Sequence, residues 1–252
     1  MSKNCWIIGA SHGIGEALAE KYFAQGYNLM ISARDAEKLN AIASRLKDKL
    51  TSQKILVSAL DVCDANSIKN SAQEFLQKIG QIDLAIFCPA IYHPTSAINF
   101  DLKQAHDTID INLKSAFSFL DAVLPPMSKK KNGHIAFVAS VAGYRGLPKS
   151  FAYGASKAAL INLCEGIYHD LKEQNIDLSI INPGFVKTRL TSKNSFIMPF
   201  ITTPQEAAEE IFKGLTAKKF EIHFPKKFTY FLKLLRILPT RFFLFITKKI
   251  SH

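Results

Sequence analysis

Cysteine is scarce in this sequence of 252 residues, and no two cysteines form a Cys-x-x-Cys pair. The four cysteines, Cys5, Cys63, Cys88 and Cys164, stand far apart along the chain. This spacing supports neither a disulfide scaffold nor a zinc ribbon, and we predict no metal site. We expect each cysteine to be a small buried hydrophobe in a reducing, cytoplasmic setting.

Acidic residues are nearly absent from the C-terminal end. Residues 218–252 hold nine Lys or Arg and one acid, a balance of +8, whereas residues 1–217 hold 23 basic and 20 acidic residues, a balance of +3. The basic end is also rich in Phe, Leu and Ile. This combination favours an anionic membrane surface over nucleic acid, which would require a mainly polar groove, so no nucleic-acid partner is predicted.

Short apolar runs alternate with helix-length segments of 3.6-residue periodicity. This alternation predicts an α/β fold with a doubly wound, Rossmann-type parallel sheet of about seven strands. We expect a dinucleotide-binding and catalytic domain over residues 1–224 and a basic, apolar helical tail over residues 225–252. The strands are expected at Cys5–Gly9, Asn28–Ser32, Ile55–Ala59, Asp83–Cys88, His134–Ala139, Asp177–Ile181 and Phe220–Phe224.

The first predicted strand runs into a glycine-rich turn that ends in a helix. In this turn Gly9 permits a tight bend, Gly13 lets the backbone approach a pyrophosphate, and Gly15 allows the helix to pack closely on the strand. The pyrophosphate would lie at the helix N-terminus, where free N–H groups and the helix dipole favour an anion. The turn therefore predicts dinucleotide binding, and glycines that serve packing alone are the alternative. The predicted contacts in the turn are Gly9, Ser11, His12, Gly13, Ile14 and Gly15.

The second predicted strand is followed by Arg34, where an acid would favour NAD. An Asp or Glu would accept a hydrogen bond from the ribose 2′-hydroxyl, whereas Arg suits the 2′-phosphate of NADP. We therefore predict NADP, with NAD as the alternative if Asp35 reads the ribose. We interpret Asp35 as the cap of the next helix.

A serine, a tyrosine and a lysine form the strongest candidate for catalysis. Ser140 follows the fifth predicted strand, while Tyr153 and Lys157 stand four residues apart and project from one helical face. A tyrosine with its ordinary pKa near ~10 is a poor acid–base catalyst at neutral pH, but a nearby ammonium favours the phenolate. The serine hydroxyl can hold a carbonyl beside the phenol as hydride reaches carbon. A Tyr-x-x-x-Lys pair alone is typical of surface helices.

The glycine turn and the Ser–Tyr–Lys set, with Asn112 and Pro183-Gly184 in the same order along the chain, resemble the short-chain dehydrogenase/reductase family over about residues 4–224. The resemblance implies that Tyr153 is the acid–base and that Ser140 orients the carbonyl or hydroxyl. It implies that Lys157 binds the nicotinamide ribose and lowers the Tyr153 pKa, while Asn112 helps to hold a water in a proton relay. The implied cofactor contacts beyond the turn and Arg34 are Asp61, Val62, Cys88, Ala90, Tyr153, Lys157, Pro183, Val186 and Thr188.

The sequence departs from the family at Phe87-Cys88-Pro89-Ala90, where the family has Asn-Asn-Ala-Gly. The missing first Asn removes a polar link that usually braces the central sheet. Pro89 lacks a backbone donor and Ala90 lacks the conformational freedom of glycine. Because the catalytic residues remain, we interpret the departure as a subgroup trait.

Two apolar segments lie beyond Thr188. Phe196, Ile197, Met198 and Phe200 fall where the family closes a segment over substrate, which predicts an apolar ligand; anchoring of the loop on the domain is the alternative. Lys226–Leu238 reads as an interfacial helix with a basic stripe, ended by Pro239. An arm packed on the core or on a second subunit is the alternative for this helix. The stripe consists of Lys226, Thr229, Lys233 and Arg236.

These features together predict an NADP(H)-preferring oxidoreductase that interconverts a carbonyl and an alcohol on an apolar, lipid-like small molecule. We expect a cytoplasmic homo-oligomer with peripheral contact at the inner surface of an anionic membrane. The alternative is a non-enzymatic cofactor-binding or membrane-docking protein on the same fold.

Overall fold

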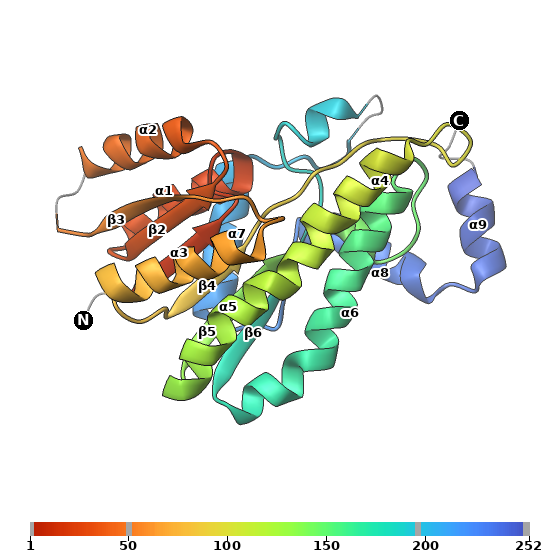
Figure 1. Ribbon diagram of the computed structural model, residues 1–252. Helices are drawn as coiled ribbons and strands as arrows, with labels where there is room; N and C mark the ends of the chain where they lie inside the picture. The colour runs from red at the N-terminus through yellow and green to blue at the C-terminus, as the bar shows by residue number, and fades with distance from the viewer. Residues whose placement is uncertain (1–2, 49–51, 195–197, 249–252) are drawn as a thin grey trace.

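The computed structural model describes residues 3–48, 52–194 and 198–248. Its described strands form one parallel sheet in the order β3-β2-β1-β4-β5-β6-β7, with helices on both faces (Figure 1). The predicted doubly wound sheet is confirmed, and the predicted strand ends differ from the observed ones by no more than two residues. The strands are β1 (Asn4–Ile8), β2 (Asn28–Ala33), β3 (Ile55–Ala59), β4 (Leu84–Phe87), β5 (Gly133–Val138), β6 (Ile176–Pro183) and β7 (Glu221–Phe224).

The helices divide between the two faces because the central strands β1, β4 and β5 are buried on both sides. In β1, Trp6 and Ile8 pack with α3, α5 and α6, while Cys5 and Ile7 pack with α1, α2 and α7. This near-continuous apolar strand is typical of a parallel sheet covered twice. The helices are α1 (Gly13–Ala24), α2 (Ala36–Lys47), α3 (Ala65–Lys78), α4 (Leu102–Ile109), the π-helical η1 (Asp110–Lys114), α5 (Ser115–Lys130), the short η2 (Val141–Gly143), α6 (Phe151–Glu173), the short η3 (Thr191–Lys193), α7 (Pro204–Thr216), α8 (Lys226–Ile237) and α9 (Thr240–Lys248).

Aromatic packing braces the sheet where the family places a polar link. Phe87, at the end of β4, is fully buried, and its ring centre lies 5.3 Å from that of Phe119 and 5.7 Å from that of Phe137. Trp6 adds a ring 6.1 Å from Phe119. Tilted aromatic pairs of this kind contribute beyond the area that they bury. The substitution of Asn by Phe87 therefore exchanges a hydrogen-bonded brace for an aromatic one.

The strand order reverses between β1 and β4, and this reversal positions the site. The chain proceeds from β1 outward to β3 on one side, then returns to β4 and proceeds outward to β7 on the other. The loops that follow β1 and β4 therefore diverge and leave a crevice at the carboxyl edge of the sheet, where open α/β sheets bind ligands.

The tail folds as two helices, and α8 ends one residue before the end predicted for it, ahead of Pro239. Its predicted stripe does not form an outer polar face. Thr229 is fully buried and shares a 2.6 Å hydrogen bond with His223, and Lys233 forms an ion pair with Glu221. Thr229 and Lys233 turn inward because β7 supplies these polar partners, whereas Lys226 and Arg236 of the same stripe are exposed. No helix in the described part of the chain is both long and apolar enough to cross a membrane.

Arg145 fastens the end of α8 to the loop between β5 and α6. Its guanidinium donates hydrogen bonds to the carbonyl oxygens of Leu235 at 2.9 Å and Leu238 at 2.6 Å. The same group lies 4.1 Å from the ring centre of Phe243 in α9. These bonds satisfy carbonyls that a helix C-terminus leaves without intrahelical partners. The tail is thus attached to the segment that joins Ser140 to Tyr153.

The orientation of α8 predicts opposite results for two adjacent leucines. Leu235 is 7% exposed and Leu234 is 57% exposed. Leu235→Ala should cost at least about 2 kcal/mol of the free energy that holds the tail in place, because it opens a cavity. Amides of α8 should then exchange hydrogen about 30-fold faster in mass spectrometry. Leu234→Ala is the matched control, and equal exchange in both variants would contradict the assigned buried face.

Candidate active site

A cavity of about 510 Å³ lies at the carboxyl edge of the sheet. It is lined by segments that follow β1, β2, β3, β4, β5 and β6. All but two of the predicted site residues line it; the exceptions are Gly15 and Asn112. The predicted residues that it brings together are Gly9, Ser11, His12, Gly13, Ile14, Arg34, Asp61, Val62, Cys88, Ala90, Ser140, Tyr153, Lys157, Pro183, Val186 and Thr188.

The glycine turn lies too close to neighbouring backbone for side chains at Gly9 and Gly15. Gly9 has φ +86°, and a Cβ there would lie 2.9 Å from the carbonyl carbon of Cys88. A Cβ on Gly15 would lie 2.2 Å from the Gly9 carbonyl oxygen. Gly15 is therefore a packing residue, which explains its position behind the cavity wall. The turn brings the N-terminus of α1, at Gly13, to the cavity.

Basic side chains surround the part of the cavity next to β2. Arg34, Lys38 and Arg189 line it together with His12. Burial lowers the pKa of His12, and the positive charges of Arg189 and Lys38 lower it further. His12 Nδ1 bonds Ser11 Oγ at 3.0 Å, whereas Nε2 is buried without a partner among the described residues. The local potential therefore favours an anion.

Asp35 is occupied by the start of α2. Its carboxylate accepts a 3.1 Å hydrogen bond from the Lys38 backbone N–H and lies 2.8 Å from Lys38 Nζ. Its interpretation as a helix cap is confirmed. Lys38 and Arg189 were not predicted from the sequence as cavity residues. Lys38 could have been noted as a basic residue in the first helical turn after Asp35, and Arg189 as the basic residue directly after Thr188.

Ser140, Tyr153 and Lys157 meet on one side of the cavity. Helix α6 places Tyr153 and Lys157 one turn apart, with Lys157 Nζ 5.7 Å from the centre of the Tyr153 ring. Lys157 is buried and donates a 2.9 Å hydrogen bond to the carbonyl of Val138, at the end of β5. Ser140 Oγ accepts a 3.1 Å bond from the Ala142 N–H. The Ser140 side chain also bonds the Tyr153 phenol.

Burial controls the protonation of this set. It raises the pKa of Tyr153 to about 12, although the hydrogen bond with Ser140 acts in the opposite direction. It also lowers the pKa of Lys157 to about 8. Desolvation of the phenolate is the largest effect on the Tyr153 pKa, and Lys157 Nζ is directed at the Val138 carbonyl, so the implied lowering of that pKa by Lys157 stays a prediction.

Asn112 lies in η1, behind the cavity, and its described bonds all go to protein groups. Its Oδ1 accepts from the Ile91 N–H at 2.8 Å, and its Nδ2 donates to the Ile91 carbonyl at 3.0 Å and to Ser156 Oγ at 3.1 Å. Ser156 in turn donates to the Tyr153 carbonyl at 2.7 Å. Asn112 thereby joins the segment after β4 to the first turn of α6.

The segment after β6 reaches across the cavity. Lys193 Nζ donates a 2.9 Å hydrogen bond to the Tyr92 carbonyl, and the Tyr92 ring stands edge-on to Tyr153 with centres 5.1 Å apart. Met198 does not line the cavity, and Phe200 lies with its ring centre 6.3 Å from that of Phe228. Phe196 and Ile197, also expected over substrate, lie outside the described residues.

Comparisons with known proteins agree with this geometry. A family profile described as short chain dehydrogenase matches residues 3–196. An uncharacterized oxidoreductase of Myxococcus xanthus is 32% identical over 239 residues, which cover 94% of this chain and 93% of that protein. An alcohol dehydrogenase from the archaeon Thermococcus sibiricus, solved with 5-hydroxy-NADP, has a TM-score of 0.81 at 24% identity and covers 89% of this chain and 96% of that one. A short chain dehydrogenase/reductase from Burkholderia phymatum, solved with NAD, has a TM-score of 0.84 at 21% identity and covers 92% of each chain. These solved structures share the fold of this chain.

The buried ammonium of Lys157 predicts a pH-dependent stability. Its pKa of about 8 lies below the ordinary value of 10.5, so the unfolded chain binds more protons between these values and wild-type stability rises with pH there. Lys157→Met removes that penalty. Its stability advantage over wild type should shrink by roughly 3 kcal/mol between about pH 7 and pH 10.5, measured by urea unfolding.

An exposed lysine provides the control for this experiment. Lys129, on the outer side of α5, is exposed, and its replacement by Met should give a stability difference that stays flat with pH. If the stability difference between Lys157→Met and wild type also stays constant with pH, the ammonium of Lys157 is not desolvated in the folded protein.

Proposed function

The chain belongs to the short-chain dehydrogenase family, and we propose that it is an NADP(H)-preferring oxidoreductase acting on an apolar carbonyl or alcohol. One observation carries the proposal: Ser140, Tyr153 and Lys157 line the same cavity as the N-terminus of α1. A catalytic set and a dinucleotide cradle are thus within reach of one ligand. The non-enzymatic alternative does not account for the presence of the Ser140–Tyr153–Lys157 set in the same cavity as the start of α1.

The cavity wall fits a dinucleotide. The start of α1 offers backbone N–H groups to a pyrophosphate. His12 Nε2, which is buried without a partner among the described residues, and the basic groups near β2 offer contacts to a further phosphate. When bound, such a cofactor supplies or accepts the hydride. We assign its nicotinamide half to the side of Lys157. The other residues proposed to hold that half are Cys88, Ala90, Pro183, Val186 and Thr188, with Asp61 and Val62 at the adenine.

Tyr153 exchanges the proton in the proposed mechanism. With a pKa of about 12 the phenol is protonated at neutral pH, so it can donate to a carbonyl oxygen that becomes a hydroxyl. Ser140 would hold that same oxygen beside the phenol. The ammonium of Lys157 would stabilise the phenolate that remains, and Asn112 would act through the Ile91 segment and a water relay. Alcohol oxidation uses the same groups in reverse.

The cavity composition supports an apolar substrate. Ile91, Ile111 and Leu190 line the same cavity as the Ser140–Tyr153–Lys157 set. Such side chains bury hydrocarbon and leave the polar groups to orient the reacting oxygen. A cytoplasmic location and assembly into a homo-oligomer complete the proposal.

Replacing the proton donor tests the mechanism. Tyr153→Phe keeps the ring and removes the hydroxyl, so carbonyl reduction should fall by ~100- to 10,000-fold while cofactor affinity changes little. Cofactor oxidation at about 340 nm with a panel of ketones and aldehydes measures turnover, and cofactor titration measures binding. Tyr92→Phe, in the neighbouring ring, is the matched control and should retain activity. Near-full activity of Tyr153→Phe would refute this mechanism.

Arg34 determines the cofactor preference in this proposal. A charge-assisted bond to the 2′-phosphate contributes about 10- to 100-fold in affinity, so wild type should bind NADP more tightly than NAD. Arg34→Gln should lower the affinity for NADP by that factor of about 10- to 100-fold and leave the affinity for NAD unchanged, because NAD has no 2′-phosphate. Calorimetric titration of both variants with both cofactors measures it. If wild type binds NAD equally or more tightly, Asp35 becomes the ribose reader and the NADP preference is withdrawn.

A further inference from the structure

The outer faces of α8 and α9 carry a set of exposed large hydrophobic side chains. On α8 the exposed positions follow the helical repeat, so they form one face; they are Tyr230 at 59%, Phe231 at 54%, Leu234 at 57% and Ile237 at 76%. On α9 Phe242 is 65% exposed and Leu244 is 59% exposed. We call these six residues the tail surface. Exposed apolar side chains gathered in this way mark an interaction site.

Polar contacts hold the tail surface outward. Glu221 on β7 accepts hydrogen bonds from Tyr144 at 2.7 Å and from Asn182 at 3.0 Å, and it pairs with Lys233 on the inner side of α8. Arg145 holds the C-terminal end of α8. The inner side of α8 is thus committed to the domain. Turning the hydrophobic face inward would break these contacts.

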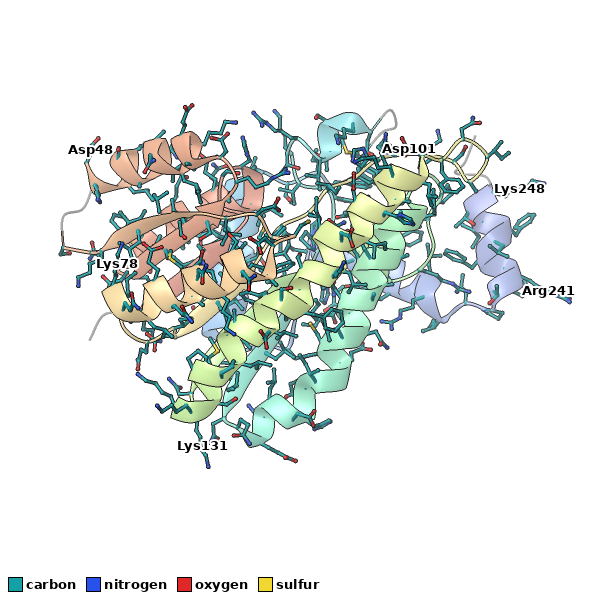
Figure 2. The ribbon with its side chains drawn as sticks, in the orientation of Figure 1. Asp48, Lys78, Asp101, Lys131, Arg241 and Lys248 are labelled. Atoms are coloured by element: carbon teal, nitrogen blue, oxygen red, sulfur yellow. The ribbon has the colours of Figure 1, made fainter. Side chains whose placement is uncertain are left out.

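The charged residues of α8 and α9 are all basic. Lys226, Lys227, Arg236 and Arg241 are exposed on the same two helices. In Figure 2 Arg241 extends away from the body of the molecule. No acidic residue follows Glu221 in the sequence, and Glu221 is engaged by Lys233. Any occupant of this surface must therefore be both apolar and anionic.

A second copy of this chain does not meet that requirement through the same surface. A symmetric contact would place the basic groups of one copy against those of the other, with no carboxylate on the tail between them. An anionic lipid bilayer satisfies both demands, because its acyl region accepts the hydrophobic face and its headgroups attract the basic residues.

We propose that α8 and α9 dock this protein onto an anionic lipid bilayer. The tail lies at the same end of the molecule as the starts of α4 and α6 (Figure 1). Helix α6 begins at Phe151, two residues before Tyr153, and Phe151 is 41% exposed. Docking would therefore bring the catalytic end of the molecule toward the membrane. The docking itself does not depend on the proposed activity.

Flotation of the full-length protein with vesicles tests the proposal without cofactor or substrate. Vesicles of phosphatidylcholine with phosphatidylglycerol should bind the protein, vesicles of phosphatidylcholine alone should bind it weakly, and salt should release it. Lys227→Gln with Arg241→Gln should lower the partition coefficient about 30-fold, from about 1 kcal/mol for each basic residue near the surface. Phe231→Ser with Phe242→Ser should lower it at least about 10-fold.

Matched exposed residues on α5 are the controls. Phe117→Ser and Lys129→Gln change the same residue types, and both should leave binding unchanged. Because every substituted side chain is exposed, thermal unfolding should confirm that all variants fold. Failure of the full-length protein to bind anionic vesicles at low salt overturns the proposal. An equal loss of vesicle binding in the controls also overturns it. The same holds if the Phe231→Ser and Phe242→Ser substitutions change the mass of the protein in analytical ultracentrifugation, since a second copy would then cover the tail surface.

Discussion

A parallel sheet places the carboxyl ends of all its strands on one edge, and the site of this protein depends on that constraint. The reversal of strand order between β1 and β4 opens the crevice, and residues distant in the sequence enter it because each follows a strand. The close approach of Gly9 to Cys88 joins the two sides of the reversal. Tight packing at this point keeps the start of α1 directed at the cavity.

The charged and ionisable side chains of the cavity are buried in one part and exposed in another. Around Tyr153 and Lys157 burial opposes charge, raising the pKa of the phenol and lowering that of the ammonium. Near β2, several cations share an exposed region where solvent limits the cost of their repulsion. One cavity therefore combines the partly buried Tyr153 and the buried Lys157 with the exposed Arg34, Lys38 and Arg189.

The tail is coupled to the catalytic loop through neighbouring residues. Tyr144 bonds Glu221 and Arg145 bonds the end of α8, and both stand between Ser140 and Tyr153. The tail is thus attached by hydrogen bonds to the segment between Ser140 and Tyr153. The aromatic brace of Phe87 supports the other side of the same cavity from within the sheet.

Local spacing in the sequence was sufficient to predict the strand–helix alternation, the glycine turn and the extent of α8, whereas the Ser140–Tyr153–Lys157 set rested also on the resemblance to a known family. These features depend on residues a few positions apart or on a repeated order of elements, so the chain itself records them. Only the tertiary structure decided that Phe87 replaces a polar brace, that Asn112 holds Ile91, that Lys38 and Arg189 join the cavity and that the Tyr153 pKa is raised. It also decided which face of α8 is outward, because Lys233 finds Glu221 and the end of the helix finds Arg145, 90 residues from Leu235. The hydrophobicity pattern of a helix does not by itself say which face packs on the domain, because the residues that contact the buried face lie elsewhere in the sequence.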